Sequence, residues 1–271
     1  MNIYIINLPK DKKRKSFQEK QLQAFNLTYE IIPAVTIDNI TKQTYEQHKN
    51  DWQRPLRNVE IACYYSHKYL WQRIINDNEA ALILEDDALL SKCIPNILDD
   101  LSTLKHIDYI NLEVVGRKKI VAKEFKTLPH CNTQLYRLYL DRNGTGGYIL
   151  YPSGAKKLLE LEKKIGIGLS DAHINACYNL MAYQIEPAAV IQLDQCRQYG
   201  ITPPLEGLSN IGTLQKPTIE ADKKWYFILK RIRAQLRQGL QHILYFFQSK
   251  KRDIKIRVED FEFSKKDGHY E

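Results

Sequence analysis

Residues 81–90 read ALILEDDALL, which is a short apolar run, three consecutive acids and a second apolar run. An apolar run of this length, rich in Leu and Ile, is typical of a buried strand. Side chains alternate along a strand, so Glu85 and Asp87 point to one side and Asp86 points to the other. Buried carboxylates that repel one another need a partner of opposite charge. The stretch therefore predicts a buried strand whose end presents Glu85 and Asp87 to a hard divalent cation, Mn²⁺ or Mg²⁺.

Strand-like and helix-like stretches alternate on both sides of this strand. β-Rich apolar runs predict further strands at 2–8, 29–35, 109–115, 145–151 and 188–193. Apolar residues three or four apart predict helices at 11–25, 58–76, 94–104, 153–164 and 171–181. The alternation favours an α/β fold with a mostly parallel sheet flanked by helices. Ligands of such sheets bind beyond the carboxyl ends of the strands, which is where the acids of residues 85–87 lie.

The charge of the chain is concentrated near its C-terminal end. The formal net charge is +8, yet residues 223–252 contain nine Lys or Arg and no Asp or Glu, so the remainder is close to neutral. We therefore expect no nucleic-acid partner for the body of the protein. We predict a first domain at 1–212 and a basic extension at 213–271. Five scattered cysteines without CxxC spacing argue against a disulfide framework or a zinc site.

The segment 225–247 reads WYFILKRIRAQLRQGLQHILYFF and predicts a basic amphipathic helix. It suits the anionic surface of a membrane, and it equally suits docking on the body or on a second subunit. No segment approaches the ~20 apolar residues that a membrane span needs, and the N-terminal apolar run is too short for a secretory signal. We expect a cytoplasmic protein that associates peripherally with the inner face of the cytoplasmic membrane.

The predicted helix at 58–76 carries polar side chains on its buried stripe. Glu60, Cys63, His67, Leu70 and Ile74 lie three or four residues apart and so share one face. The stripe is polar where the helix begins, and a helix N-terminus favours anions. His67 is either a buried structural histidine or part of a binding pocket. The neighbouring Ser66 is an alternative local partner for the backbone.

Four segments of the chain resemble, in order, the motifs of glycosyltransferase family 25, which contains lipopolysaccharide and lipooligosaccharide sugar transferases. They are NIYIINLPKDKKRK at 2–15, VEIACYYSH at 59–67 followed by LW, ALILEDDA at 81–88 and GTGGYILYPSGAKKLL at 144–159. The resemblance covers residues 1 to about 209. One departure is Ala62, where the family commonly has glycine, and a helix tolerates this methyl group.

The resemblance implies a GT-A-like, Rossmann-like fold that binds a nucleotide sugar. It implies that Glu85 and Asp87 hold the metal against the diphosphate of the donor. Other residues are expected to bind the donor, either from the resemblance or from their residue types. They are Asn7, Arg14, Glu60, Ser66, His67, Asp86, Gly146 and Gly147. The glycines would let the backbone approach a sugar or a diphosphate closely, although an ordinary tight turn explains them equally well.

Family resemblance also implies an inverting reaction, in which a general base deprotonates the acceptor hydroxyl. Asp171, in GLSDAHINA, is the candidate because it places a carboxylate at a predicted helix start. Its alternative role is to cap that helix or to interact with the helix dipole.

The predicted activity is transfer of a hexose, with galactose first, from a UDP-sugar to a lipid-linked saccharide of lipopolysaccharide or lipooligosaccharide. Two other classes stay open. A Mg²⁺-dependent phosphohydrolase or nucleotidyltransferase would use the same acids and would release phosphate or pyrophosphate instead of UDP. A non-enzymatic adaptor that binds lipid or RNA would depend on the basic segment alone. The oligomeric state is open.

Overall fold

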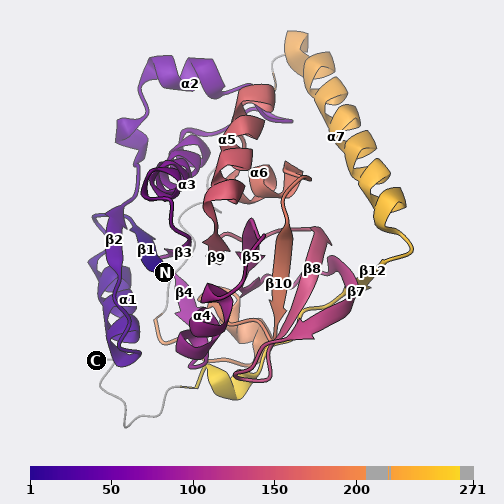
Figure 1. Cartoon of the computed structure of the whole chain (residues 1–271). Helices are drawn as coiled ribbons and strands as arrows, with labels where there is room; N and C mark the ends of the chain where they lie inside the picture. Colours follow the sequence, from indigo (N-terminus) through magenta and orange to yellow (C-terminus); the bar gives the residue numbers. More distant parts are fainter. Residues whose placement is uncertain (206–218, 220, 263–271) are drawn as a thin grey trace.

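The computed structural model describes residues 1–205, 219 and 221–262 and contains a nine-stranded sheet flanked by helices (Figure 1). The strand order is β12-β7-β8-β10-β5-β9-β3-β1-β2. The strands are β1 (Asn2–Asn7), β2 (Glu30–Pro33), β3 (Ala81–Glu85), β5 (Tyr109–Asn111), β7 (Lys119–Thr127), β8 (Gln134–Leu140), β9 (Gly147–Leu150), β10 (Ala182–Glu186) and β12 (Ser249–Arg252). The predicted α/β class is confirmed.

The sheet is mixed, so the prediction of a mostly parallel sheet is wrong. β1 runs parallel to β2 and β3, and β5 runs parallel to β10. Between these two groups lies β9, which is antiparallel to both β3 and β5. The β7–β8 hairpin and β12 extend the sheet with further antiparallel pairs. β9 follows β8 through a loop without a crossover helix, which permits the antiparallel direction.

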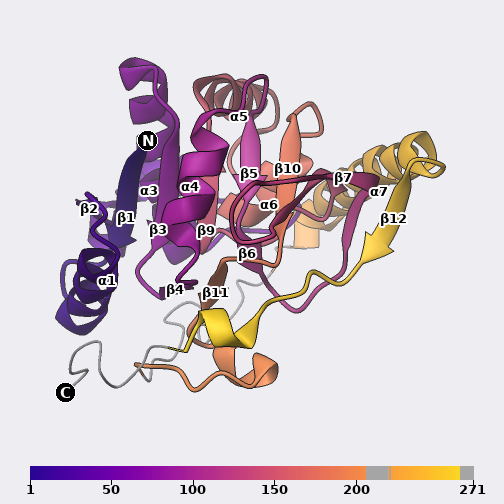
Figure 2. The same cartoon turned by 60° about the horizontal axis from the view of Figure 1, so that its bottom comes forward.

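Helices cover both faces of the sheet. They are α1 (Lys12–Ala24), α2 (Lys42–His48), α3 (Asn58–Asp77), α4 (Ile94–Ser102), α5 (Pro152–Ile165), α6 (Ser170–Ala176) and α7 (Lys224–Tyr245). One core cluster joins α3 and α5 to a face of the sheet through Trp71 and Leu158, both fully buried. The other joins α4 to the opposite face through Ile94 and Leu101. Figure 2 shows α4 and α5 on opposite sides of the sheet.

A second, three-stranded sheet lies at the carboxyl end of β3. It consists of β4 (Ala88–Leu90), β11 (Val190–Gln192) and β6 (Glu113–Val114), in the order β4-β11-β6. β11 is antiparallel to β4, with Gln192 opposite Ala88. Because Ala88 follows the acidic triplet directly, this pairing brings Gln192 beside Glu85 and Asp87.

The structure corrects several sequence-based boundaries. The helix predicted at 171–181 ends at Ala176, and the segment that follows leads into β10, which the sequence pattern did not predict. The hairpin of β7 and β8 lies where no regular element was expected. Its strands alternate buried and exposed positions only over part of their length, so the period-2 signal is weak.

The C-terminal part of the chain contains a long helix and then returns to the sheet. α7 lies along the side of the molecule next to β8 (Figure 1). After it, β12 pairs with β7, and Ile254 and Phe261 belong to the first core cluster. The predicted domain boundary at 212 and 213 lies outside the described residues.

Candidate active site

A pocket of about 570 Å³ lies at the carboxyl ends of β1 and β3. The parallel pairing of these strands places Ile6 opposite Glu85, so both strands deliver their last residues to one edge of the sheet. α3 and the segment after β2 form the opposite wall. Six predicted site residues line the pocket: Arg14, Ser66, His67, Glu85, Asp86 and Asp87. Further lining residues include Lys10, Thr36, Asp38, Cys63 and Gln192.

The acidic triplet divides as strand alternation predicts. Nε2 of Gln192 lies 3.3 Å from Oε2 of Glu85 and 3.4 Å from Oδ1 of Asp87, so these two carboxylates converge on one amide. Asp86 is directed elsewhere. Its Oδ1 accepts a hydrogen bond from Nη1 of Arg14 at 2.9 Å, and its Oδ2 accepts one from Nδ2 of Asn7 at 2.9 Å. Asn7, which is buried, thus reaches the site through Asp86.

Glu85 is held in place by two side chains. Oγ1 of Thr145 donates to Oε1 of Glu85 at 2.5 Å, and Nε2 of His67 lies 3.4 Å from the same oxygen. Burial favours the neutral carboxyl, but His67 and then Thr145 more than offset it and lower the pKa of Glu85. We therefore regard Glu85 as ionised.

His67 is buried, and a hydrogen bond on the side away from Glu85 holds its ring. Its Nδ1 lies 2.9 Å from the hydroxyl of Tyr148, which also accepts a hydrogen bond from Nε1 of Trp71 at 3.0 Å. Burial alone would lower the pKa of His67, yet Tyr148, Cys63 and Glu85 together raise it well above its usual value. His67 therefore has two roles. Its contact with Tyr148 anchors the ring in the core, and its Nε2 faces the pocket and orients Glu85.

Among the three acids, Asp87 has the environment that most disfavours its ionised form. Burial and then the charge of Glu85 raise its pKa to about 7, although Arg14 lies 3.6 Å away. Two convergent carboxylates that repel each other, with Asp87 buried and Glu85 partly buried, fit a divalent cation that takes few protein ligands and completes its coordination with water and phosphate oxygens. Within the described residues, no group of three or more His, Cys, Asp or Glu side chains is arranged to hold a metal ion. A cation at Glu85 and Asp87 would therefore need further ligands from water or from a substrate.

Ser66 joins α3 to the segment after β2. Its hydroxyl donates to the carbonyl of Ala62 at 3.0 Å and accepts from the backbone N–H of Val35 at 2.9 Å. These bonds fulfil the backbone role considered from the sequence. They also hold residues 34–38 against α3, where they close the pocket.

Glu60 lies outside the pocket lining. Arg54 donates from both terminal nitrogens to its carboxylate at 2.9 and 2.7 Å, and Nη2 of Arg57 lies 2.8 Å from Oε1. The backbone N–H of Arg57 also donates to Glu60 at 2.9 Å, which completes the start of α3. The observed contacts of Glu60 are thus those of a structural ion-pair cluster.

Gly146 and Gly147 allow their loop to pack closely against β11. Added Cβ atoms would lie 2.8 Å from Cγ of Gln192 at Gly146, and 2.7 Å from the methyl groups of Val190 at Gly147. The carbonyl of Gly146 accepts from the backbone N–H of Glu85 at 3.1 Å. These glycines therefore let the loop press against β11 and position Glu85 indirectly.

Asp171 lies in the first turn of α6 and is not among the residues that line the pocket. Its Oδ1 accepts from the backbone N–H of Ala172 at 2.7 Å. Burial raises its pKa, and the charge of Glu85 adds to the rise, while Arg117 and His67 oppose it. Burial thus disfavours the charged form of Asp171.

Two polar residues of the site escaped the sequence analysis. Gln192 ends a short apolar strand more than 100 residues after the triplet, and nothing local marks it. Glu113 is fully buried behind the loop, where Oε2 accepts from the backbone N–H of Gly146 at 2.8 Å. Burial and the charge of Glu85 raise its pKa well above the usual value. An acid inside an apolar predicted strand was the available signal for Glu113.

Comparison with known protein families assigns the chain to one of them. The sequence profile of glycosyltransferase family 25 (LPS biosynthesis protein) matches residues 1–174. The chain belongs to glycosyltransferase family 25. The match includes α1, α3, β3 and the turn that follows β3, which carry all six predicted residues of the pocket wall, and it ends within α6.

A relative from Haemophilus influenzae (strain ATCC 51907 / DSM 11121 / KW20 / Rd), named "Putative glycosyltransferase", is 29% identical over 170 residues. The match covers 59% of this chain and 57% of that protein, so the chain matches little more than half the length of this relative.

Two solved structures share lower similarity. The crystal structure of a glycosyltransferase involved in the glycosylation of the major capsid of PBCV-1 is 14% identical, with a TM-score of 0.32, and covers 60% of this chain and 68% of its own. The inositol-1-phosphate CTP transferase from T. maritima is 12% identical, with a TM-score of 0.38, and covers 70% and 88%. At these TM-scores neither structure supports a conclusion about this chain.

Proposed function

We propose that this protein is an inverting, metal-dependent glycosyltransferase that moves a hexose, galactose first, from a UDP-sugar to a saccharide acceptor of lipopolysaccharide or lipooligosaccharide. The observation that carries the proposal is the convergence of Glu85 and Asp87 on Gln192 inside the pocket. Family membership supports the reaction class, and the preference for galactose comes from the family resemblance.

Glu85 and Asp87 would hold Mn²⁺ or Mg²⁺ together with the diphosphate of the donor. A bound divalent cation supplies Lewis-acid stabilisation of the charge that develops on the leaving UDP. Lys10 and Arg14, which also line the pocket, add positive charge toward the same phosphates. Arg14 keeps its contacts with Asp86 and Asp87 and therefore binds as a fixed, preorganised group.

Asp171 would accept the proton of the acceptor hydroxyl. The acceptor oxygen then attacks C1 of the sugar from the face opposite UDP, the bond between C1 and the UDP oxygen breaks, and the configuration at C1 inverts. Burial of Asp171 raises its pKa, which suits a group that must take up a proton at neutral pH. The carboxylate lies on α6, beside the pocket and not within its lining, and this leaves the pocket to the donor.

α7 supports association with an anionic membrane surface. None of the helices formed by the described residues is long and apolar enough to cross a bilayer. The outer face of α7 nevertheless exposes large apolar side chains, with Leu236 64% and Ile243 74% exposed. The helix also carries basic residues, such as Arg231 and Arg233, which lie toward the body. A basic helix with an exposed apolar face suits the cytoplasmic leaflet. Such an enzyme would meet a lipid-linked acceptor at the inner face of the membrane.

The proposal is tested with a panel of UDP-sugars, incubated with the full-length protein and Mn²⁺ or excess EDTA. We expect metal-dependent release of UDP with one hexose donor and thermal stabilisation by the same donor. Release of inorganic phosphate or pyrophosphate would instead identify a phosphohydrolase or a nucleotidyltransferase. An adaptor would be favoured by two results together. The wild-type protein would turn over none of the UDP-sugars, and the Glu85→Gln/Asp87→Asn variant would bind anionic lipids as the wild type does.

A further inference from the structure

Two cavities separate α7 from the body of the protein, away from the donor pocket. The smaller, about 270 Å³, lies between α5, the segment after α6 and α7. The larger, about 590 Å³, lies between residues 51–53, α6 and α7. They share Lys164, Ala176, Tyr178 and Arg237, so together they form one continuous groove along α7.

α7 is attached to the body on either side of this groove. Near its start, Nζ of Lys230 donates to the carbonyls of Asn50 and Asp51 at 2.9 and 2.7 Å. At its end, the ring of Tyr245 stacks on Tyr139, with centroids 4.2 Å apart. The groove is therefore built by tertiary contacts at both ends and is not a gap beside a loosely placed helix.

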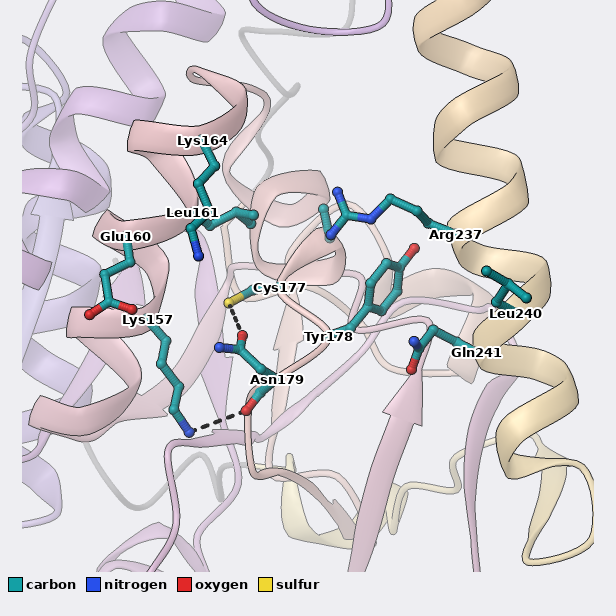
Figure 3. Close-up of a pocket in the computed structure, with 11 residues that line it drawn as sticks. Lys157, Glu160, Leu161, Lys164, Cys177, Tyr178, Asn179, Arg237, Leu240 and Gln241 are labelled. Atoms are coloured by element: carbon teal, nitrogen blue, oxygen red, sulfur yellow. Dashed lines mark hydrogen bonds between the residues drawn. The ribbon is translucent and has the colours of Figure 1, made fainter.

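The groove presents cationic side chains that lack an acidic partner. Lys164, Arg233 and Arg237 form no ion pair with any residue in the described part of the chain. Figure 3 shows Arg237 reaching from α7 toward Tyr178, and its guanidinium carbon lies 5.6 Å from the centre of that ring. Stacking on a neutral ring leaves the guanidinium hydrogen-bond donors available to a ligand.

Other charged side chains of the groove have polar partners within the protein. Nζ of Lys157 contacts Asp108 at 2.5 Å, and Asp51 contacts Nδ1 of His48 at 2.7 Å. Glu160, at the rim of the smaller cavity, is the remaining acid without an ion pair among the described residues that line the groove. Four cations without an ion pair among the described residues, with Lys230 included, against Glu160 and Asp51 leave an excess of positive charge, which favours an anionic ligand.

The remaining lining suits a carbohydrate. Trp52 and Tyr178 contribute aromatic rings, and Asn175, Asn179 and Gln241 contribute side-chain amides. Sites for small polar molecules combine such apolar surfaces with a few hydrogen-bonding groups. An Arg side chain next to this surface matches a phosphate or carboxylate carried by the sugar.

α6 connects the groove to the donor pocket. Ala172, Asn175 and Ala176 face the groove. On the same helix, Oγ of Ser170 lies 3.6 Å from Sγ of Cys63, which lines the donor pocket. A saccharide that occupied the groove would therefore lie beside the helix that carries Asp171.

We propose that the groove between α7 and the body binds an anionic saccharide, bearing phosphate or carboxylate, as the part of the acceptor remote from the hydroxyl that reacts. The proposal rests on the transferase function proposed above. It assigns Lys164 and Arg237 as specificity-determining residues for the anionic group.

The test measures binding to the full-length protein by calorimetry. The probe is the phosphorylated oligosaccharide released from lipopolysaccharide by mild acid, compared with the same oligosaccharide after enzymatic removal of phosphate. We expect the phosphorylated form to bind more tightly, and Lys164→Gln/Arg237→Gln to weaken its binding by about tenfold or more, since charge-assisted hydrogen bonds are lost.

The matched control is Lys156→Gln/Lys163→Gln, which removes the same charge from exposed positions of α5 that do not line the groove. We expect wild-type binding from this control. Equal binding of the two oligosaccharides, or equal losses in both double variants, would overturn the proposal. The proposal would also be overturned if millimolar inorganic phosphate alone displaced the oligosaccharide completely. Binding to phosphatidylglycerol vesicles without binding to the oligosaccharide would overturn it as well.

A separate measurement distinguishes this inference from the proposed function. Hydrolysis of the UDP-sugar without acceptor is followed in the wild-type protein. Absence of hydrolysis would count against the transferase, whereas hydrolysis without preference for the phosphorylated oligosaccharide would overturn only the role of the groove.

Discussion

Arg14 donates from Nη1 to Oδ1 of Asp86 at 2.9 Å, and both side chains are largely buried. The contact ties α1 to the end of β3 and turns the middle acid of the triplet away from Glu85 and Asp87. We therefore expect Asp86→Asn to lower the free energy of unfolding by about 2 kcal/mol, because a charge-assisted hydrogen bond is lost and a buried guanidinium loses a partner. Urea unfolding measures this change. Unchanged stability with weakened metal affinity would make Asp86 a direct ligand instead.

Asp87→Asn should have the opposite profile. The amide keeps the shape of the side chain and removes its repulsion with Glu85, so we expect stability equal to or above that of the wild type. Transfer in the presence of Mn²⁺ should fall by roughly two orders of magnitude, because one of the two carboxylates for the cation is gone. The control is Asp194→Asn, an exposed acid shortly after β11. Full activity of Asp87→Asn, or of the wild type in excess EDTA, would disprove the metal site.

Asp171→Asn should separate transfer from donor binding. We expect transfer to the acceptor to fall about 100-fold, the usual scale for loss of a general base, with UDP affinity changed by less than about threefold. Steady-state kinetics and calorimetry with UDP measure the two quantities. A parallel loss of UDP affinity would place Asp171 in the donor site, and wild-type transfer would leave it as a residue of the α6 N-terminus.

Glu60 should contribute to stability in a pH-dependent way. Burial raises its pKa, but the hydrogen bonds from Arg54 and Arg57 outweigh burial and hold the pKa below its ordinary value of 4.5. Its contribution is therefore fully present above about pH 4.5 and is lost as the pH falls through the lower folded-state value. We expect Glu60→Gln to reduce the free energy of unfolding by about 2 kcal/mol at pH 7.

The difference between wild type and Glu60→Gln should shrink as denaturation is measured at progressively lower pH below 4.5. A difference that is constant with pH would mean that the carboxylate charge of Glu60 does not stabilise the fold. Calorimetry with UDP serves as the control, because a structural Glu60 predicts donor affinity close to that of the wild type.

The outer face of α7 should determine binding to membranes. We expect the triple variant Leu229→Gln/Leu236→Gln/Ile243→Gln to lose sedimentation with phosphatidylglycerol vesicles, because these exposed side chains would otherwise enter the headgroup boundary. The three residues do not line the groove, so the fold and the groove should persist. The control is Tyr69→Gln, which replaces an exposed aromatic residue on α3. Vesicle binding equal to the wild type would favour a protein partner for this face.

Much of the site could be predicted from local pattern. Strand alternation separates Asp86 from Glu85 and Asp87, and helical spacing places His67 on the buried face of α3, because both periodicities are set by the backbone geometry of a single element. The same signals predicted the parallel strands β1 and β3 whose ends form the pocket. The ordered motifs identified the family before any contact was known.

Long-range pairing decided what those patterns left open. The antiparallel insertion of β9 between β3 and β5 and the pairing of β11 with β4 depend on hydrogen bonds between segments far apart in the chain. That pairing brings Gln192 to the acids, a contact that no local sequence signal specifies. Likewise, Glu60 has the spacing of a pocket residue, but the fold brings Arg54 and Arg57 to its carboxylate. The sequence alone determined the family, the α/β class and the direction of the three acids, since these depend on local order and periodicity. Only the tertiary structure decided the partners of each charge, because burial and distance between remote segments set their energies.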